Sequence, residues 1–168
     1  MIDLLTPTER PRGRLSPHFT YDEMTATSVR DVSNEPSAVE LENLGFLCRR
    51  LLEPVRLEFG PLHTTSGYRS LAVNLAIGGS KTSAHMEGCA WDGVPLSPGV
   101  RWADVIAFLQ RREDLPVDQV IYEFVTRSSG WLHVGTKPGG AGCRRQFLMI
   151  HSAGHYEKWN PNDPRVKR

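Results

Sequence analysis

The chain has 168 residues, of which 39% are hydrophobic and 23% charged, and its formal net charge is +1. This length and composition are typical of one globular domain with a single core. The near-neutral charge argues against nucleic-acid binding, which usually requires a strong basic excess. No apolar run approaches the roughly 18 residues of a membrane span, so we expect no membrane insertion. The first residues lack the basic start and long apolar middle of a signal peptide.

The N-terminal third of the chain is predicted to be an extended arm followed by helices. Residues 1–14 are rich in Pro, Arg and Thr and show no period. Thr20 is a suitable N-cap for a first short helix. Pro36 is placed to open a long amphipathic helix, which Pro54 should kink or restart and which Gly60 should end.

The rest of the chain alternates between helical and β-rich segments, which predicts an α+β fold: a small, largely antiparallel β-sheet flanked by helices. Residues 15–152 would form the domain, and residues 153–168 a loosely held polar tail. The predicted elements are a strand and turn over 62–70, a helix over 71–77 capped by Ser70, a strand over 89–94, a helix from 97 to 112, and strands over 118–125, 131–136 and 146–150.

Metal-binding side chains cluster in the middle of the sequence. His85 and Asp92 are seven residues apart, and Gly88 lies between them where the chain must turn. Imidazole and carboxylate groups are good zinc ligands. A third candidate ligand, His133, follows in the segment Trp131-Leu132-His133-Val134. These residues predict a three-ligand metal site.

A β-hairpin over residues 118–136 would place an acid beside the third ligand. If the hairpin closes over residues 126–130, Val125 pairs with Trp131 and Glu123 with His133. Residues directly opposite each other share one face of a sheet, with Cβ atoms about 4.5–5.5 Å apart. Glu123 would then be placed to act as a general base, whereas a register shifted by one residue would put it on the other face.

Together these motifs resemble the M15 zinc peptidases, and most closely their D-Ala-D-Ala carboxypeptidase-like branch. The resemblance runs from about residue 15 to residue 150. It rests on Ser66-Gly67-Tyr68-Arg69, on the spaced motif Ser83-x-His85-x-x-Gly88-x-Ala90-x-Asp92, on Glu123, and on Trp131-x-His133. It implies a fold of the Hedgehog/DD-peptidase type, Zn2+ held by His85, Asp92 and His133, and hydrolysis of peptidoglycan stem peptides.

One position departs from the pattern of several relatives, in which the catalytic acid lies three residues before the last histidine. That position is Gly130 in this chain, so Glu123 is the natural replacement as base. Arg69 would stabilise the oxyanion or bind the terminal carboxylate of the substrate, since a guanidinium binds carboxylates through two parallel hydrogen bonds. Ser83 and Tyr68 would contribute to substrate binding.

The sequence therefore predicts a zinc metallopeptidase that cleaves stem peptides through a metal-activated water, either as a D,D-carboxypeptidase or as an endopeptidase. The alternative is an inactive zinc-containing structural or peptidoglycan-binding module of a bacteriophage particle. The expected site of action is the periplasm or cell wall. Without a signal peptide, delivery by phage lysis machinery or within a virion is compatible with the sequence, and the oligomeric state is left open.

Overall fold

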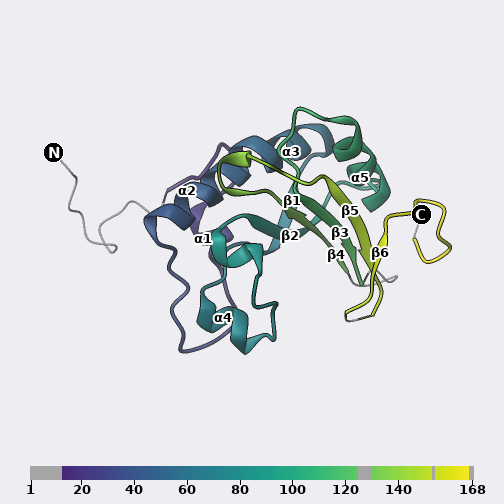
Figure 1. Cartoon of the computed structure of the whole chain (residues 1–168). Helices are drawn as coiled ribbons and strands as arrows, with labels where there is room; N and C mark the ends of the chain where they lie inside the picture. The colour runs from purple at the N-terminus through teal and green to yellow at the C-terminus, as the bar shows by residue number, and fades with distance from the viewer. Residues whose placement is uncertain (1–12, 125–129, 153, 167–168) are drawn as a thin grey trace.

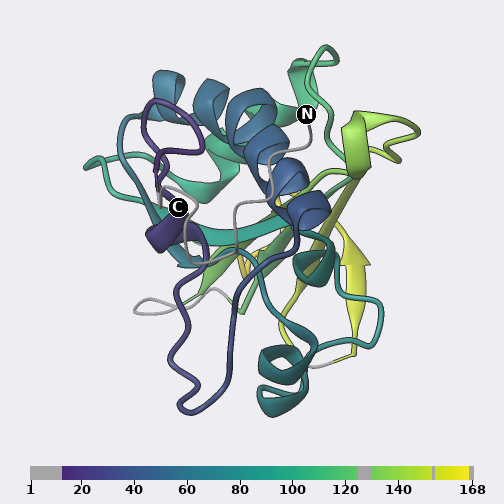
Figure 2. The same ribbon diagram turned by 90° about the vertical axis from the view of Figure 1, so that its left-hand side faces the viewer.

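The computed structural model describes residues 13–124, 130–152 and 154–166 as a mixed β-sheet with helices on both sides (Figure 1). The helices α2, α3 and α5 lie over one face of the sheet, and the short helix α4 lies beyond the other face. The turned view in Figure 2 shows the same two layers, with α4 projecting away from the sheet. This α+β architecture confirms the predicted fold class.

The sheet has six strands in the order β1-β2-β4-β3-β5-β6. Four of its strand pairs are antiparallel, whereas β3 and β5 run parallel. The strands are β1 (Leu62–Ser66), β2 (Ala90–Pro95), β3 (Gln119–Glu123), β4 (Trp131–Gly135), β5 (Gln146–Ile150) and β6 (Tyr156–Lys158). The sheet is therefore largely antiparallel, as predicted, and the parallel pair places the C-terminal strands beside β3.

The predicted long helix is a continuous run of three pieces. They are α2 (Ala38–Leu47), a π-helical segment η2 (Cys48–Leu52) and α3 (Glu53–Phe59), which Gly60 ends with a positive φ of 81°. The irregular segment ends two residues before Pro54, which lacks an N–H group and crowds the carbonyl four residues earlier, within that segment. The prediction of an interruption near Glu53 is thus confirmed.

The predicted start of this helix at Pro36 was slightly wrong. Ser37 is the N-cap: its hydroxyl accepts a hydrogen bond from the backbone N–H of Glu40, and the Glu40 carboxylate accepts one from the backbone N–H of Ser37. This reciprocal capping box satisfies two of the free N–H groups at the start of α2.

Two short helices begin directly after the N-cap residues predicted for them. Thr20 caps α1 (Tyr21–Met24) and Ser70 caps α4 (Leu71–Ala76), both as predicted. The helix predicted from residue 97 begins later, since α5 spans Trp102–Arg111. A positive φ of 81° at Gly99 prevents a helix from continuing through that position.

Side chains of the central strands alternate between two different environments. Those pointing toward the long helices belong to the hydrophobic core, and include Trp91, Val120, Tyr122, Leu132, Val134 and Met149. The intervening residues point to the opposite face. They include Asp92, Ile121, Glu123 and His133, which line a cleft. The fold thus separates a core face from a face available for chemistry.

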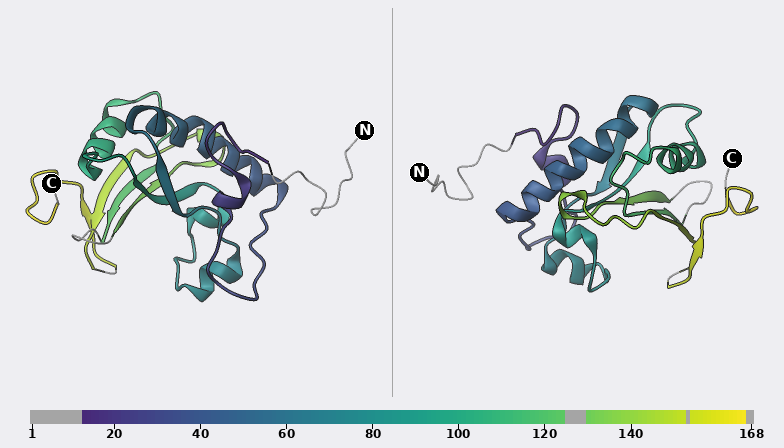
Figure 3. Two further views of the ribbon diagram at one scale, coloured as in Figure 1. Left: turned by 180° about the vertical axis from the view of Figure 1, so that it is seen from behind. Right: turned by 45° about the horizontal axis from the view of Figure 1, so that its top comes forward.

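The segment after Gly154, expected to be loosely held, is packed against the domain. Strand β6 pairs with β5, and the side chains of Trp159 and Val166 are buried in the core. Figure 3 shows this segment at the edge of the sheet. None of the helices in the described parts of the chain has the length and apolar character that crossing a bilayer requires.

Candidate metal centre

Three elements bring the predicted ligands together on the open face of the sheet. His85 lies on the 3-10 helix η3 (Ala84–Glu87), Asp92 on β2 and His133 on β4. Asp92 and His133 are direct cross-strand partners, so the β2–β4 register fixes their separation. His85 reaches them because the chain reverses at Gly88.

Gly88 is required by both its backbone conformation and its surroundings. Its φ is 69°, in the left-handed region that favours glycine. A Cβ atom there would lie 2.2 Å from the backbone carbonyl oxygen of Glu40 on α2. The turn therefore allows η3 to pack against α2 and directs His85 toward the sheet, which confirms the turn predicted at this glycine.

The ligand atoms of the three residues converge on one point. Oδ1 of Asp92 lies 2.8 Å from Nδ1 of His133 and 3.1 Å from Nε2 of His85, and the two nitrogens are 3.3 Å apart. All three side chains are largely buried. Four tetrahedral ligands at zinc–ligand distances near 2.0–2.1 Å would be about 3.3 Å from each other. The donor set and its spacing therefore fit a small tetrahedral metal ion.

A second contact fixes the orientation of His85. Its Nδ1 lies 2.6 Å from the backbone carbonyl oxygen of Gly67, which can only accept a hydrogen bond. The proton of the neutral ring is thus on Nδ1, and Nε2 presents a lone pair to the centre. Hydrogen bonds of this kind commonly orient metal-binding histidines.

The electrostatics of the centre favour the ligand forms of Asp92 and His85. Burial alone would raise the pKa of Asp92, but His85 and His133 outweigh it and hold that pKa well below its usual value. Burial lowers the pKa of His85, which favours the neutral imidazole. For His133, Asp92 outweighs burial and raises the pKa, as expected for two groups held together by opposite charge.

Arg69 holds the remaining oxygen of the aspartate. Its Nη2 donates to Oδ2 of Asp92, and its Nε donates to the hydroxyl of Ser66 at 2.8 Å. The segment containing Arg69 is itself fixed by Asn34, whose amide donates to the carbonyl of Tyr68 and accepts from the backbone N–H of Ser70. Arg69 therefore lies within the site and orients one of the candidate ligands.

Glu123 lies on the cleft face of the sheet, as the hairpin argument expected, but the register of the β3–β4 pair differs from the predicted one. Glu123 pairs with Trp131, and Ile121 pairs with His133. The predicted pairing of Glu123 with His133 was wrong by two residues, and the predicted partner Val125 lies outside the described residues. Because a two-residue shift preserves the face of the sheet, Glu123 and His133 still project to the same side. Burial raises the pKa of Glu123 above its usual value, although His133 acts in the opposite direction.

The centre opens into a cleft of about 540 Å3. Arg69, Ser83 and Glu123 all line it, together with the three candidate ligands. Tyr68 does not: its side chain is buried in the hydrophobic core, where burial and the nearby Glu40 raise its pKa to about 12. The cleft thus unites most of the residues singled out from the sequence.

Several residues that support the site were not assigned a function from the sequence. Ser66 and Gly67 belong to the recognised Ser66-Gly67-Tyr68-Arg69 segment, but their contacts with Arg69 and His85 depend on folding. No role in the site was predicted for Asn34. Its partners are 34 and 36 residues away, so no local pattern could identify it.

Comparison with known proteins agrees with this geometry. The family model described as Peptidase M15 matches residues 17–134, which include all three candidate ligands and Glu123. No curated protein matches the chain. Since the match covers well over half of the sequence, the chain belongs to the peptidase M15 family.

Proposed function

We propose that the protein is a zinc-dependent peptidase that hydrolyses stem-peptide bonds in peptidoglycan. His85, Asp92 and His133 would be the zinc ligands, and Glu123 the general base. The observation that carries this proposal is the convergence of two imidazoles and a carboxylate within 3.3 Å of each other, in a cleft that is also lined by the half-buried acid Glu123. A zinc ion at such a site polarises a carbonyl group and lowers the pKa of a bound water.

Glu123 supplies the proton transfers in this proposal. Its carboxylate takes a proton from the attacking water and delivers it to the amine that leaves when the peptide bond breaks. A raised pKa suits this task, because the group must both accept and release a proton near neutral pH. Its position on β3, diagonal to His133 on β4, supports this role, and Glu123 is not one of the three residues whose ligand atoms converge.

Arg69 and Ser83 would act on the substrate. Arg69 donates one hydrogen bond to Ser66 and one to Asp92. A guanidinium group has five N–H donors, so others are left for the substrate. The remaining donors can stabilise an oxyanion or bind a terminal carboxylate. Ser83 lines the same cleft and offers a hydroxyl for substrate orientation.

Membership of the M15 family supports a peptidoglycan-related substrate. The test is digestion of purified peptidoglycan and soluble muropeptides by the zinc-loaded protein, with the products identified by mass spectrometry and a chelator-treated sample as control. Chelator-sensitive release of a single alanine would establish a D,D-carboxypeptidase. Cleaved cross-bridges or stems would instead establish an endopeptidase.

The same experiment can overturn the proposal. A protein that contains stoichiometric zinc but releases no product from any of these substrates would not be a stem-peptide hydrolase. That result would favour the alternative function, an inactive zinc-containing structural or peptidoglycan-binding module.

A further inference from the structure

The cleft extends beyond the candidate metal centre toward a cluster of charged residues. At one end of it lie Glu123 and Tyr156, and at the other lie Asp118, Thr136 and Arg144. The metal ligands are between these two ends, since Ile121 in the middle of β3 pairs with His133. A substrate lying along the sheet would therefore meet both ends.

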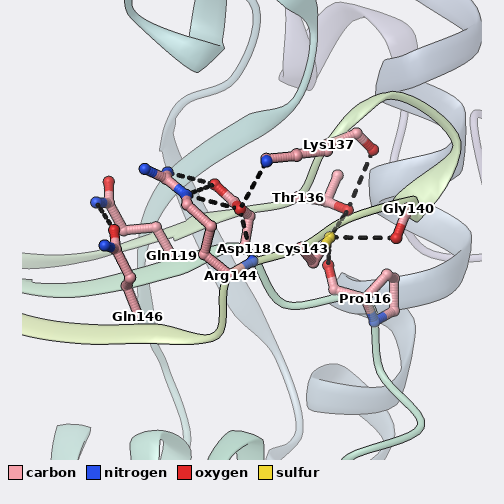
Figure 4. Close-up of polar contacts among 9 residues, drawn as sticks. All are labelled: Pro116, Asp118, Gln119, Thr136, Lys137, Gly140, Cys143, Arg144 and Gln146. Atoms are coloured by element: carbon pink, nitrogen blue, oxygen red, sulfur yellow. Dashed lines mark hydrogen bonds and ion pairs between the residues drawn. The ribbon is translucent and has the colours of Figure 1, made fainter.

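Asp118 directly precedes β3 and is held there by its backbone and by its carboxylate. Its backbone N–H donates to the carbonyl of Gly135 at 2.8 Å, and its carbonyl accepts from the backbone N–H of Gln146 at 2.9 Å. The carboxylate accepts hydrogen bonds from the backbone N–H, Nε and Nη2 of Arg144. Lys137 approaches the same carboxylate, with its Nζ atom 3.9 Å from Oδ1. Figure 4 shows Arg144 and Lys137 on two sides of Asp118.

This cluster carries an excess positive charge. Burial alone would raise the pKa of Asp118, but the hydrogen bonds from Arg144 outweigh it and lower the pKa, so the carboxylate is ionised at neutral pH. Two cations then face one anion. The Asp118 side chain is 8% exposed, whereas those of Arg144 and Lys137 are 49% and 39% exposed. Arg144 lines the cleft, and Lys137 lies beside it through its contact with Asp118, so the unneutralised positive charge faces solvent at this end.

The other residues lining this end do not cancel that charge. Gln119, Gly135 and Thr136 are neutral. Among the described residues, Nη1 of Arg144 has no hydrogen-bonding partner, because the bonds to Asp118 use only Nε and Nη2 of the guanidinium. Arg144 is therefore oriented by Asp118 and still has donors for a ligand.

The register gives the distance from the cluster to the metal centre. Asp118 precedes Ile121 by three strand positions, and Ile121 is the partner of His133. At about 3.4 Å per residue, the separation is roughly 10 Å along the sheet. An extended peptide covers this distance with about three residues, and the long arginine side chain reduces it.

We propose that Arg144 and Lys137, oriented by Asp118, form an anion-binding subsite for a substrate carboxylate two or three residues from the scissile bond. This inference rests on the proposed peptidase function, and it adds a substrate preference to it. The preferred substrate would be an acidic peptide. Its carboxylate would bind at the end of the cleft remote from Glu123, where it would also avoid repulsion by that acid.

The test uses pairs of synthetic stem-like peptides that differ only in a side-chain carboxylate or carboxamide, placed two or three residues from the cleaved bond on either side. Binding by calorimetry and kcat/KM are measured for the full-length zinc-loaded protein and for Arg144→Gln and Lys137→Met. Arg112→Gln is the matched control, because Arg112 also forms an ion pair with a carboxylate, that of Asp114, but does not line the cleft.

The wild-type protein should bind the acidic member of one pair about fivefold more tightly than its amide, the effect expected for a half-exposed ion pair. Arg144→Gln should remove this preference and Lys137→Met should reduce it, while Arg112→Gln should retain it. Equal binding of the acidic peptide and its amide by the wild-type protein would overturn the subsite. This result does not depend on a variant, so misfolding of a variant cannot account for it.

The two proposals fail separately. If the protein cleaves both peptides of every pair equally, the peptidase function stands and the subsite does not exist. If it cleaves none but still binds the acidic peptides more tightly through Arg144, the subsite stands and the hydrolytic function is wrong.

Discussion

Arg69 and Asp92 form an ion pair that occupies Oδ2 of the carboxylate and leaves Oδ1 facing His85 and His133. The arginine thus orients the aspartate toward the two histidines. Because Arg69 also donates from Nε to Ser66, its guanidinium plane is fixed by two partners at once. This arrangement makes the forked shape of arginine, and not only its charge, important to the site.

Arg69→Lys should therefore weaken catalysis although the charge is retained. A lysine ammonium group is a compact point charge and cannot reach Ser66 and Asp92 with the same planar geometry. Loss of a charged hydrogen bond of about 1.5 kcal/mol or more corresponds to a decrease of about tenfold in kcat/KM. The measurement is steady-state cleavage of a soluble muropeptide, with Arg112→Lys as the control. Unchanged kinetics in Arg69→Lys would show that the forked guanidinium of Arg69 does not contribute to catalysis.

His133→Ala should abolish stoichiometric zinc binding. The substitution removes one of three converging ligand atoms and leaves two protein ligands, fewer than zinc sites normally use. Zinc per chain is measured by atomic emission after dialysis against metal-free buffer. His63→Ala is the matched control, because His63 is an exposed histidine on β1. Full zinc occupancy in His133→Ala would refute the ligand assignment.

Glu123→Gln should separate metal binding from turnover. The amide cannot accept the proton, and general-base catalysis contributes about 100-fold or more to rates. Hydrolysis should fall by at least that factor, while the zinc content and the thermal unfolding midpoint remain close to the wild-type values. Glu58→Gln, which changes an exposed acid on α3, should retain activity. A fully active Glu123→Gln would require a different base.

The local parts of the fold were predictable because they depend on neighbouring residues. The caps at Thr20 and Ser70 bond to N–H groups three residues away, so their positions follow from sequence. The ligand motif is similar, since Gly88 provides the turn between His85 and Asp92. In each case one short segment contains all the necessary information.

Predictions that needed distant partners were less accurate. The predicted hairpin register was wrong by two residues because it depended on an assumed turn length. The prediction that Glu123 and His133 lie on the same face of the sheet was correct. The parallel pairing of β3 with β5 joins strands separated by β4 and the loop after it. The packing of Trp159 and Val166 in the core also depends on tertiary contacts. The polar composition of the C-terminal segment gives no sign of these contacts.

Glu53 gives a prediction about stability that is independent of the catalytic site. Its carboxylate is almost fully buried and accepts hydrogen bonds from the hydroxyl of Ser16 at 2.7 Å and from the backbone N–H of His18 at 2.8 Å. The His18 ring nitrogen Nδ1 lies 2.7 Å from the second oxygen. These contacts fix the segment before α1 to the start of α3.

The contacts also set the direction of the pH dependence. Burial alone would raise the pKa of Glu53, but the hydrogen bonds from Ser16 and His18 outweigh it and lower the pKa. A carboxyl group whose pKa is lower in the folded than in the unfolded state stabilises the fold at pH values above the unfolded pKa, about 4.3. This stabilisation is lost as the pH falls through the folded pKa. The free energy of unfolding should therefore decrease on acidification below about pH 5.

Glu53→Gln should remove this component of the pH dependence. At pH 7 the variant should be less stable than the wild-type protein by about 1–3 kcal/mol, because charged hydrogen bonds are replaced by weaker neutral ones. The difference between the two proteins should shrink as the pH falls through the lowered pKa of Glu53 in the folded protein, because the wild-type carboxylate is then protonated as well. Urea unfolding at a series of pH values measures both effects, with the exposed Glu113→Gln as control. A constant difference at every pH would show that the ionised form of Glu53 does not stabilise the fold.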